Sequence, residues 1–258
     1  MIKMELKRAI FSKAFLAACS IAFIMLMIGA VEDIFDYLGR YISPGTWLEK
    51  YLGSLAYGTT SLLALFFSIV AIIPYVLVYR RERDSGFLQL MILKSTRNTY
   101  VSAKLLAVAC SGFLSMFLPN LCWLFLCRFW LGTGSTKYPV LNGFVYVNAL
   151  YEQQPFLCGL TYVLNAGIVG ATFALLALGL TTVIRNRYLA ILLPFCYSIF
   201  SAAILNSRWR ILNALRLLPI ELPQSKSFGY GSLLLYDLVL AVIGCVLFVG
   251  GDRFAGKA

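Results

Sequence analysis

The sequence predicts an all-α polytopic membrane protein with six transmembrane helices, and three observations lead to this fold class. Sixty per cent of the 258 residues are hydrophobic, 13% are charged and the mean hydropathy is +0.82, whereas soluble domains are nearer half apolar and a quarter charged. The apolar residues form runs of about 18 to 29 residues, long enough to cross the hydrocarbon layer as helices. The alternating segments of ~10 residues that are typical of a membrane β-barrel do not occur.

Each expected span is an apolar run bounded by polar or charged residues. The runs cover residues 14–31, 58–78, 105–127, 156–184, 188–205 and 232–250. Before them, residues 1–13 mix apolar side chains with four cations and one acid, Glu5, which predicts a short helix lying in the inner membrane interface. The first run exceeds the usual apolar core of a signal peptide, so we expect a retained helix. Pro74, Pro119 and Pro194 predict kinks in three spans.

Lys and Arg residues gather at the ends of the apolar runs, and their distribution predicts the orientation. With the N-terminus inside, most of the 22 Lys and Arg residues fall in inner segments, as the positive-inside rule requires. Both termini are therefore expected in the cytoplasm, and the acidic segment 32–57 is expected to be a polar outer loop. The net charge of +11 lies against lipid headgroups rather than in a soluble patch, so no nucleic-acid partner is expected.

Several kinds of chemistry are disfavoured by the residue types present. Histidine is absent, which removes His-based metal sites and Ser-His-Asp triads. The seven cysteines are irregularly spaced without a C-x-x-C pair, so neither a disulfide framework nor a zinc site is predicted. No G-x-x-x-x-G-K-[ST] motif occurs, and the chain is therefore not expected to cradle ATP phosphates itself.

The longest inner loop combines charge with a patterned apolar segment. Residues 79–106 are YRRERDSGFLQLMILKSTRNTYVSAKLL. The apolar side chains between Phe87 and Leu93 form a compact amphipathic turn that follows Gly86 and is too short to span a membrane. An apolar face of this kind, bracketed by charges, is typical of a helix that docks into a groove on a partner protein.

This loop resembles that of the membrane subunits of type-2 ATP-binding-cassette (ABC) exporters. In that family the loop reads E-R-E-S-G-T-L-E-x-L-L, followed by R-x-x-Y and K-x-L. Residues 82–90 match the first part, and Arg97, Tyr100 and Lys104-Leu105 match the second. The Pro that the family often has between the two parts is missing here, which leaves the backbone path of the turn open. The resemblance implies a single permease domain over residues 1–258, an interfacial N-terminal helix, and a coupling helix between the second and third spans.

What the chain does and with whom also follows from this resemblance. The residues implied to couple to the ATPase are Glu82, Arg83, Gly86, Phe87, Leu90, Met91, Arg97 and Tyr100. ATP and Mg are expected on a separate ABC ATPase subunit, with no cofactor on this chain and no enzymatic activity of its own. A second permease subunit, identical or different, is expected in the bacterial cell membrane. The exported substrate is expected to be amphipathic: a lipid, peptide, antimicrobial or glycan.

Small and polar residues inside the spans suggest further sites. Ala166, Gly170 and Ala174 have the spacing of a close helix–helix seam, with a substrate path as the alternative. Asp237, Asn165 and Asn120 are a possible intramembrane polar site; alternatively, Asp237 faces water or a cation such as Arg128, and the two asparagines bond between helices.

Two other functions remain as alternatives to the exporter. One is a non-transporting membrane scaffold or sensor. The other is an intramembrane enzyme, which is disfavoured because a single acid lies well inside a span and no His is present.

Overall fold

The structure, a computed structural model, describes residues 2–34, 46–56, 62–85, 96–130, 154–184, 186–204, 213–218 and 230–255. Its elements are α1 (Ile2–Ile10), α2 (Lys13–Ile34), α3 (Trp47–Ala56), α4 (Leu62–Ile72), α5 (Val76–Asp84), α7 (Arg97–Trp130), α9 (Pro155–Val183), α10 (Arg187–Ile204), the 3₁₀ turn η2 (Ala214–Arg216) and α11 (Tyr230–Ala255). The all-helical class predicted from the sequence is confirmed for this part of the chain.

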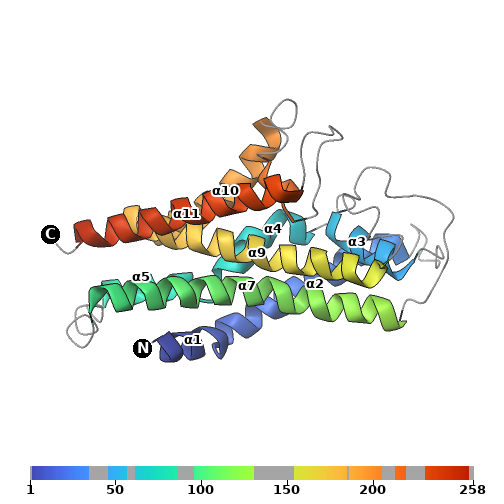
Figure 1. Cartoon of the computed structure of the whole chain (residues 1–258), viewed down its shortest axis with the longest axis horizontal. Helices are drawn as coiled ribbons and strands as arrows, with labels where there is room; N and C mark the ends of the chain where they lie inside the picture. The colour runs from blue at the N-terminus through green and yellow to red at the C-terminus, as the bar shows by residue number, and fades with distance from the viewer. Residues whose placement is uncertain are drawn as a thin grey trace.

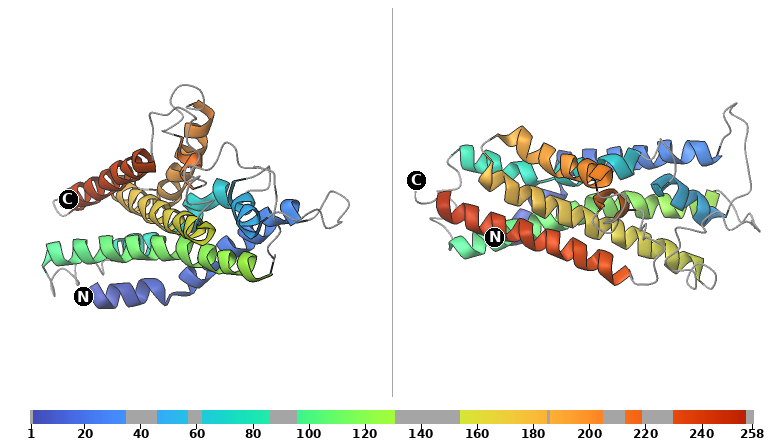
Figure 2. Two further views of the ribbon diagram at one scale, coloured as in Figure 1. Left: turned by 45° about the vertical axis from the view of Figure 1, so that its right-hand side comes forward. Right: turned by 90° about the horizontal axis from the view of Figure 1, so that it is seen from above.

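Three long helices, α7, α9 and α11, form the body of the molecule (Figure 1), with α9 packed between the other two. α7 and α9 run in opposite directions, whereas α9 and α11 run in the same direction. Both chain termini, the C-terminal end of α5 and the start of α7 lie at one end of the molecule, and α3 lies at the other (Figures 1 and 2). We call these the terminal end and the α3 end.

Four helices are long and apolar enough to cross a membrane. They contain the segments Lys13–Val31, Arg97–Trp130, Pro155–Val183 and Tyr230–Gly251, which correspond to the first, third, fourth and sixth expected spans. The segments Leu62–Ile72 and Tyr188–Ile204 are apolar but shorter. The structure therefore indicates a membrane protein with four candidate spans, and the six-span count stays a prediction.

The second expected span is divided into two helices. α4 ends at Ile72, a turn covers residues 73–75, and α5 begins at Val76. Pro74 lies in that turn, where its ring and missing N–H interrupt the helical hydrogen bonding. The other two prolines behave differently, because α7 continues through Pro119 and α10 through Pro194.

The expectation of a polar loop over residues 32–57 is wrong for residues 47–56, and the placement of this segment on the outer side stays a prediction. Residues 47–56 form α3, which packs against α2 and α7. The apolar side chains of residues 47–55 are buried, among them Trp47, Tyr51 and Leu55, and so is Lys50. Glu49 and Lys50 make the segment look polar, but the aromatic and aliphatic residues around them recur on a helical period and bury the helix.

Small residues allow the long helices to approach each other closely. A Cβ on Gly170 of α9 would lie 2.7 Å from Cγ of Met116, and one on Gly112 of α7 would lie 2.6 Å from Cβ of Ala174. The residues predicted to form a seam, Ala166, Gly170 and Ala174, are all buried. Gly170 and Ala174 pack against α7, as small-x-x-x-small spacing favours.

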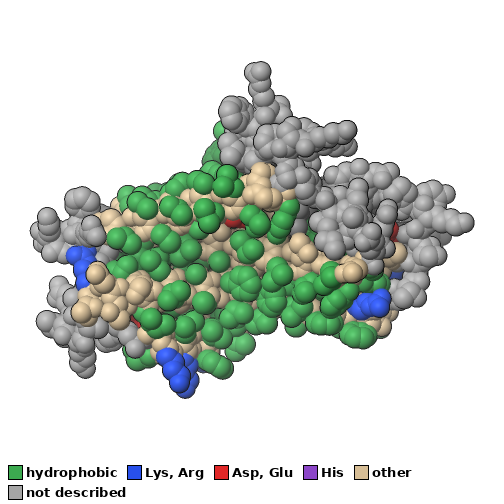
Figure 3. All heavy atoms as spheres, in the orientation of Figure 1, with side chains coloured by type: hydrophobic (Ala, Val, Ile, Leu, Met, Phe, Trp, Pro, Cys, Tyr) green, Lys and Arg blue, Asp and Glu red, His purple; other side chains and the backbone are tan. Residues whose placement is uncertain are grey.

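The surface between the two ends is apolar. Exposed large side chains include Leu16 and Ile24 on α2, Leu106 on α7, and Leu238 and Val246 on α11. Figure 3 shows one face on which hydrophobic side chains cover the middle, with Lys and Arg visible toward the ends. This distribution suits a surface surrounded by lipid.

Candidate functional site

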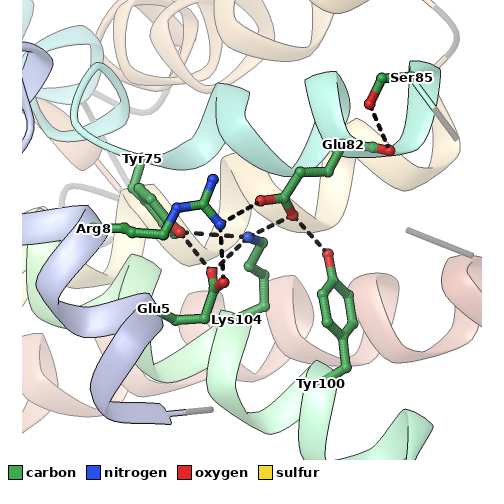
Figure 4. A network of polar contacts seen from close by, with 7 residues as sticks. All are labelled: Glu5, Arg8, Tyr75, Glu82, Ser85, Tyr100 and Lys104. Atoms are coloured by element: carbon green, nitrogen blue, oxygen red, sulfur yellow. Dashed lines mark hydrogen bonds and ion pairs between the residues drawn. The ribbon is translucent and has the colours of Figure 1, made fainter. Parts of the chain in front are cut away.

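The most elaborate polar arrangement in the described part of the chain lies at the terminal end. It consists of four charged and two aromatic side chains (Figure 4), which we call the charge cluster: Glu5 and Arg8 of α1, Tyr75 of the α4–α5 turn, Glu82 of α5, and Tyr100 and Lys104 of α7. Two carboxylates and two cations are present, so the cluster is neutral overall.

Lys104 is the centre of the charge cluster. Its Nζ lies 2.7 Å from Oε2 of Glu5 and 2.7 Å from Oε2 of Glu82. The ammonium also lies 4.8 Å from the ring centroid of Tyr75 and 5.6 Å from that of Tyr100, distances at which cation–π attraction acts. A single buried cation thus joins α1, α5 and α7.

Arg8 closes the cluster on its solvent side. Its Nη1 lies 3.2 Å from Oε1 of Glu5 and 3.1 Å from Oε1 of Glu82. The Arg8 side chain is 44% exposed, whereas that of Glu5 is fully buried and that of Glu82 is 6% exposed. Each carboxylate therefore contacts one buried and one half-exposed cation.

The two tyrosines supply the remaining donors. The Tyr75 hydroxyl donates to Oε2 of Glu5 at 2.5 Å, and the Tyr100 hydroxyl donates to Oε2 of Glu82 at 3.0 Å. Because buried carboxylates need several donors to offset lost hydration, these bonds complete the site.

Local sequence explains why these side chains meet. Glu5 and Ala9 lie one turn apart on the buried face of α1, and the small Ala9 side chain lets α1 approach α7. Tyr100 and Lys104 are likewise one turn apart on the buried face of α7. Apolar side chains from α4, α5, α7, α9 and α11 surround the cluster, Ile72, Tyr79 and Phe248 among them.

The electrostatics of Glu5 reflect two opposing effects. Burial alone disfavours its charged form, but hydrogen bonds from Lys104 and Tyr75 and the charges of Lys104 and Arg8 favour it, and together they lower its pKa below the ordinary value of 4.5. Such buried ion pairs add little net stability over an apolar core, but removing one partner is costly. We therefore interpret the cluster as a set of contacts that fixes the positions of α1, α5 and α7 relative to one another.

The charge cluster brackets the segment predicted to dock with a partner. Glu82 lies in the last turn of α5, four residues before Gly86 in the sequence, and Tyr100 and Lys104 lie in the first two turns of α7. The Tyr100–Glu82 hydrogen bond joins the two sides of this segment directly. The cluster thus links α1, α5 and α7 on both sides of residues 86–95, which lie outside the described part of the chain.

The predicted coupling residues fall into three groups. Glu82 and Tyr100 are buried and bonded to each other, and Arg97 begins α7 in a half-buried position. Arg83 belongs to the α5 backbone, but its side chain lies outside the described part of the structure. The remaining four, Gly86, Phe87, Leu90 and Met91, lie outside the described residues.

The three residues predicted as a possible intramembrane polar site are all buried, and the two asparagines bond to different groups. Asn120 donates to the Met116 carbonyl at 2.7 Å and accepts from the Tyr51 hydroxyl at 3.5 Å. Asn165 donates to the Leu217 carbonyl at 2.7 Å and accepts from the Tyr230 hydroxyl at 3.3 Å. Asp237 takes part in neither network.

Sequence reasoning did not select Glu5, Arg8, Tyr75 or Lys104 as site residues. Two features of the sequence could have indicated two of them: Glu5 is the single acid among the cations of residues 1–13, and Lys104 is the single cation at the start of the third apolar run.

Comparisons with family models, curated proteins and solved structures found no match to this chain.

Proposed function

We propose that this chain is the transmembrane permease subunit of a type-2 ABC exporter, driven by a separate ATPase subunit. The observation that supports the proposal most strongly is the charge cluster. It anchors both sides of residues 86–95, the segment whose sequence resembles the family's coupling helix, to α1 and to the long helix α7.

The proposed topology has six spans with both termini in the cytoplasm. α4 and α5 together form the second crossing, broken at Pro74, and α10 forms the fifth. The common location of both termini at one end (Figure 1) agrees with an even number of crossings. Under this orientation the charge cluster lies at the cytoplasmic side, where an ATPase subunit can reach it.

The proposed mechanism is mechanical. Closure of two ATPase subunits pushes on residues 86–95 of two permease subunits. Because Glu82 and Tyr100 hold the two sides of this segment together, the push moves α5 and α7 as one body. α1 follows through Glu5 and Arg8. The substrate is an amphipathic molecule moved outward, and ATP and Mg stay on the partner.

Purification of the tagged chain from its native membranes tests the proposal. We expect an ATPase subunit to co-purify and to show vanadate-sensitive ATP hydrolysis. The double variant Phe87→Asp/Leu90→Asp should lose this partner, because two charges would enter an apolar groove. Phe129→Asp is the matched control, since Phe129 is exposed at the α3 end of α7.

Two outcomes would contradict the proposal. One is a complex that survives the double variant unchanged. The other is a stable assembly without vanadate-sensitive hydrolysis, which would favour a scaffold or sensor. In either case size-exclusion profiles of the variants must match that of the natural chain, so that a folding defect is recognised.

A further inference from the structure

Asp237 of α11 is a buried acid that has no hydrogen-bond partner among the described residues. Its residue is 1% exposed, and neither Oδ1 nor Oδ2 has a hydrogen-bond partner. Among the described residues it also makes no ion pair. The fully bonded carboxylates of Glu5 and Glu82 show how the same chain treats buried acids elsewhere.

The packing of α11 on α9 locates the Asp237 carboxyl. Toward the terminal end, a Cβ on Gly244 would lie 2.6 Å from the Leu175 carbonyl, so the two backbones nearly touch. Toward the α3 end, the Tyr230 hydroxyl donates to Asn165 at 3.3 Å. Asp237 lies about two turns from both Tyr230 and Gly244, on the same buried face. It is therefore within the α9–α11 seam.

In the part of the chain that the structure describes, the side chains that interact with Asp237 are aromatic. Its carboxyl interacts electrostatically with Tyr230 and Tyr236, and the Tyr236 hydroxyl bonds to that of Tyr197 on α10. α9, which packs against this face, has no Asp, Glu, Lys or Arg along its whole length. Among the described residues, Tyr230 and Tyr236 are the titratable groups that interact with the Asp237 carboxyl, and Tyr197 is linked to it through Tyr236.

An unpaired carboxylate is tolerated inside a membrane only when a proton or a cation neutralises it. A carboxylate that interacts with neighbouring tyrosines suits an organic cation, because aromatic rings attract positive charge as well. Next to it on α11, the exposed apolar side chains Leu235, Leu238 and Val239 offer a surface for a hydrocarbon chain.

We propose that Asp237, with Tyr230 and Tyr236, binds the cationic group of an amphipathic organic cation that enters between α9 and α11. That this ligand is the exported substrate rests on the proposed function; the binding itself does not. The carboxyl is covered in this structure, so binding requires the seam to part, and the ligand selects the parted state.

Binding of tritiated tetraphenylphosphonium to the purified full chain in lipid nanodiscs tests the site. We expect saturable binding that dodecylguanidinium displaces and uncharged dodecanol does not. Asp237→Asn should weaken binding on the order of thirtyfold, the smaller end of the loss for one partner of a buried charge pair. Asp237→Glu, which keeps the charge, should retain most of the affinity.

Glu49→Gln is the matched control. Like Asp237→Asn, it removes one acid near the α3 end, but this acid belongs to α3 and lies outside the α9–α11 seam. It should bind as the natural chain does. Unchanged binding in Asp237→Asn, or equal displacement by dodecanol, would overturn the proposal and leave Asp237 as a protonated structural residue. The assay contains no ATPase, so failure to bind and failure to form an exporter complex are separate results. Matching size-exclusion profiles exclude a folding defect.

Discussion

The charge cluster and the α9–α11 seam handle buried charge in opposite ways. In the cluster, Lys104 and Arg8 each contact both carboxylates. Two tyrosine hydroxyls donate the remaining hydrogen bonds to these carboxylates. In the seam, no described residue forms a hydrogen bond with Asp237. A paired cluster fixes the positions of the helices that contribute to it, whereas an unpaired carboxyl must be neutralised by a proton or by a cation. We propose that the first site transmits force and that the second receives a ligand.

The largest expected effect comes from removing the centre of the cluster. Lys104→Met leaves two buried carboxylates with Arg8 alone, and we expect the free energy of unfolding to fall by about 3–5 kcal/mol. Lys7→Met is the matched control, because Lys7 is exposed on α1, and its effect should stay within about 0.5 kcal/mol. Denaturant unfolding in detergent measures both. Equal effects of the two variants would contradict the positional role of Lys104.

The α9–α11 seam should respond to overpacking at its closest point. A Cβ on Gly244 would lie 2.6 Å from backbone atoms of Leu175, so Gly244→Ala should cost about 1–3 kcal/mol by forcing the helices apart. Gly250→Ala is the control, since nothing lies within 4 Å of a Cβ there. Thermal unfolding distinguishes the two variants. A neutral Gly244→Ala would show that the seam is looser than the structure indicates.

Removal of the unpaired acid should have the opposite sign to removal of Lys104. Asp237→Leu deletes a buried group without a hydrogen bond, so the ligand-free chain should gain about 1 kcal/mol in its free energy of unfolding. Leu238→Ala, at an exposed position of the same helix, serves as the control in the same measurement. A destabilised Asp237→Leu variant would mean that the carboxyl has a structural partner, and the contrast between the two regions would fail.

The smallest expected effect is the dependence of the cluster on pH. Because the pKa of Glu5 is lowered in the folded chain, its contribution to stability is complete above the ordinary value of 4.5 and is lost as the pH falls below it. The difference in stability between the natural chain and Glu5→Gln should therefore shrink as the pH is lowered from about 7 through this range. Unfolding curves at several pH values measure it; a difference independent of pH would contradict the assignment.

The hydropathy of the sequence predicted the long apolar helices. It did not predict the elements and contacts that depend on tertiary packing. The four long spans follow from apolar runs, and α9 begins and ends within one residue of its prediction. α3 was missed because Glu49 and Lys50 suggested a polar loop. The charge cluster could not be predicted because Lys104 and Glu5 lie 99 residues apart and Arg8 and Glu82 lie 74 apart. Pairing at that distance along the chain depends on packing of α1 against α7.

The central claim, that residues 86–95 dock with an ATPase subunit, is tested most directly by photocrosslinking in native membranes. A photoreactive amino acid in place of Leu90 should capture a protein that contains a nucleotide-binding G-x-x-x-x-G-K-[ST] motif, identified by mass spectrometry. The same amino acid in place of Phe129, at the α3 end, should not capture it. Capture from Phe129 alone, or from neither position, would contradict the claim.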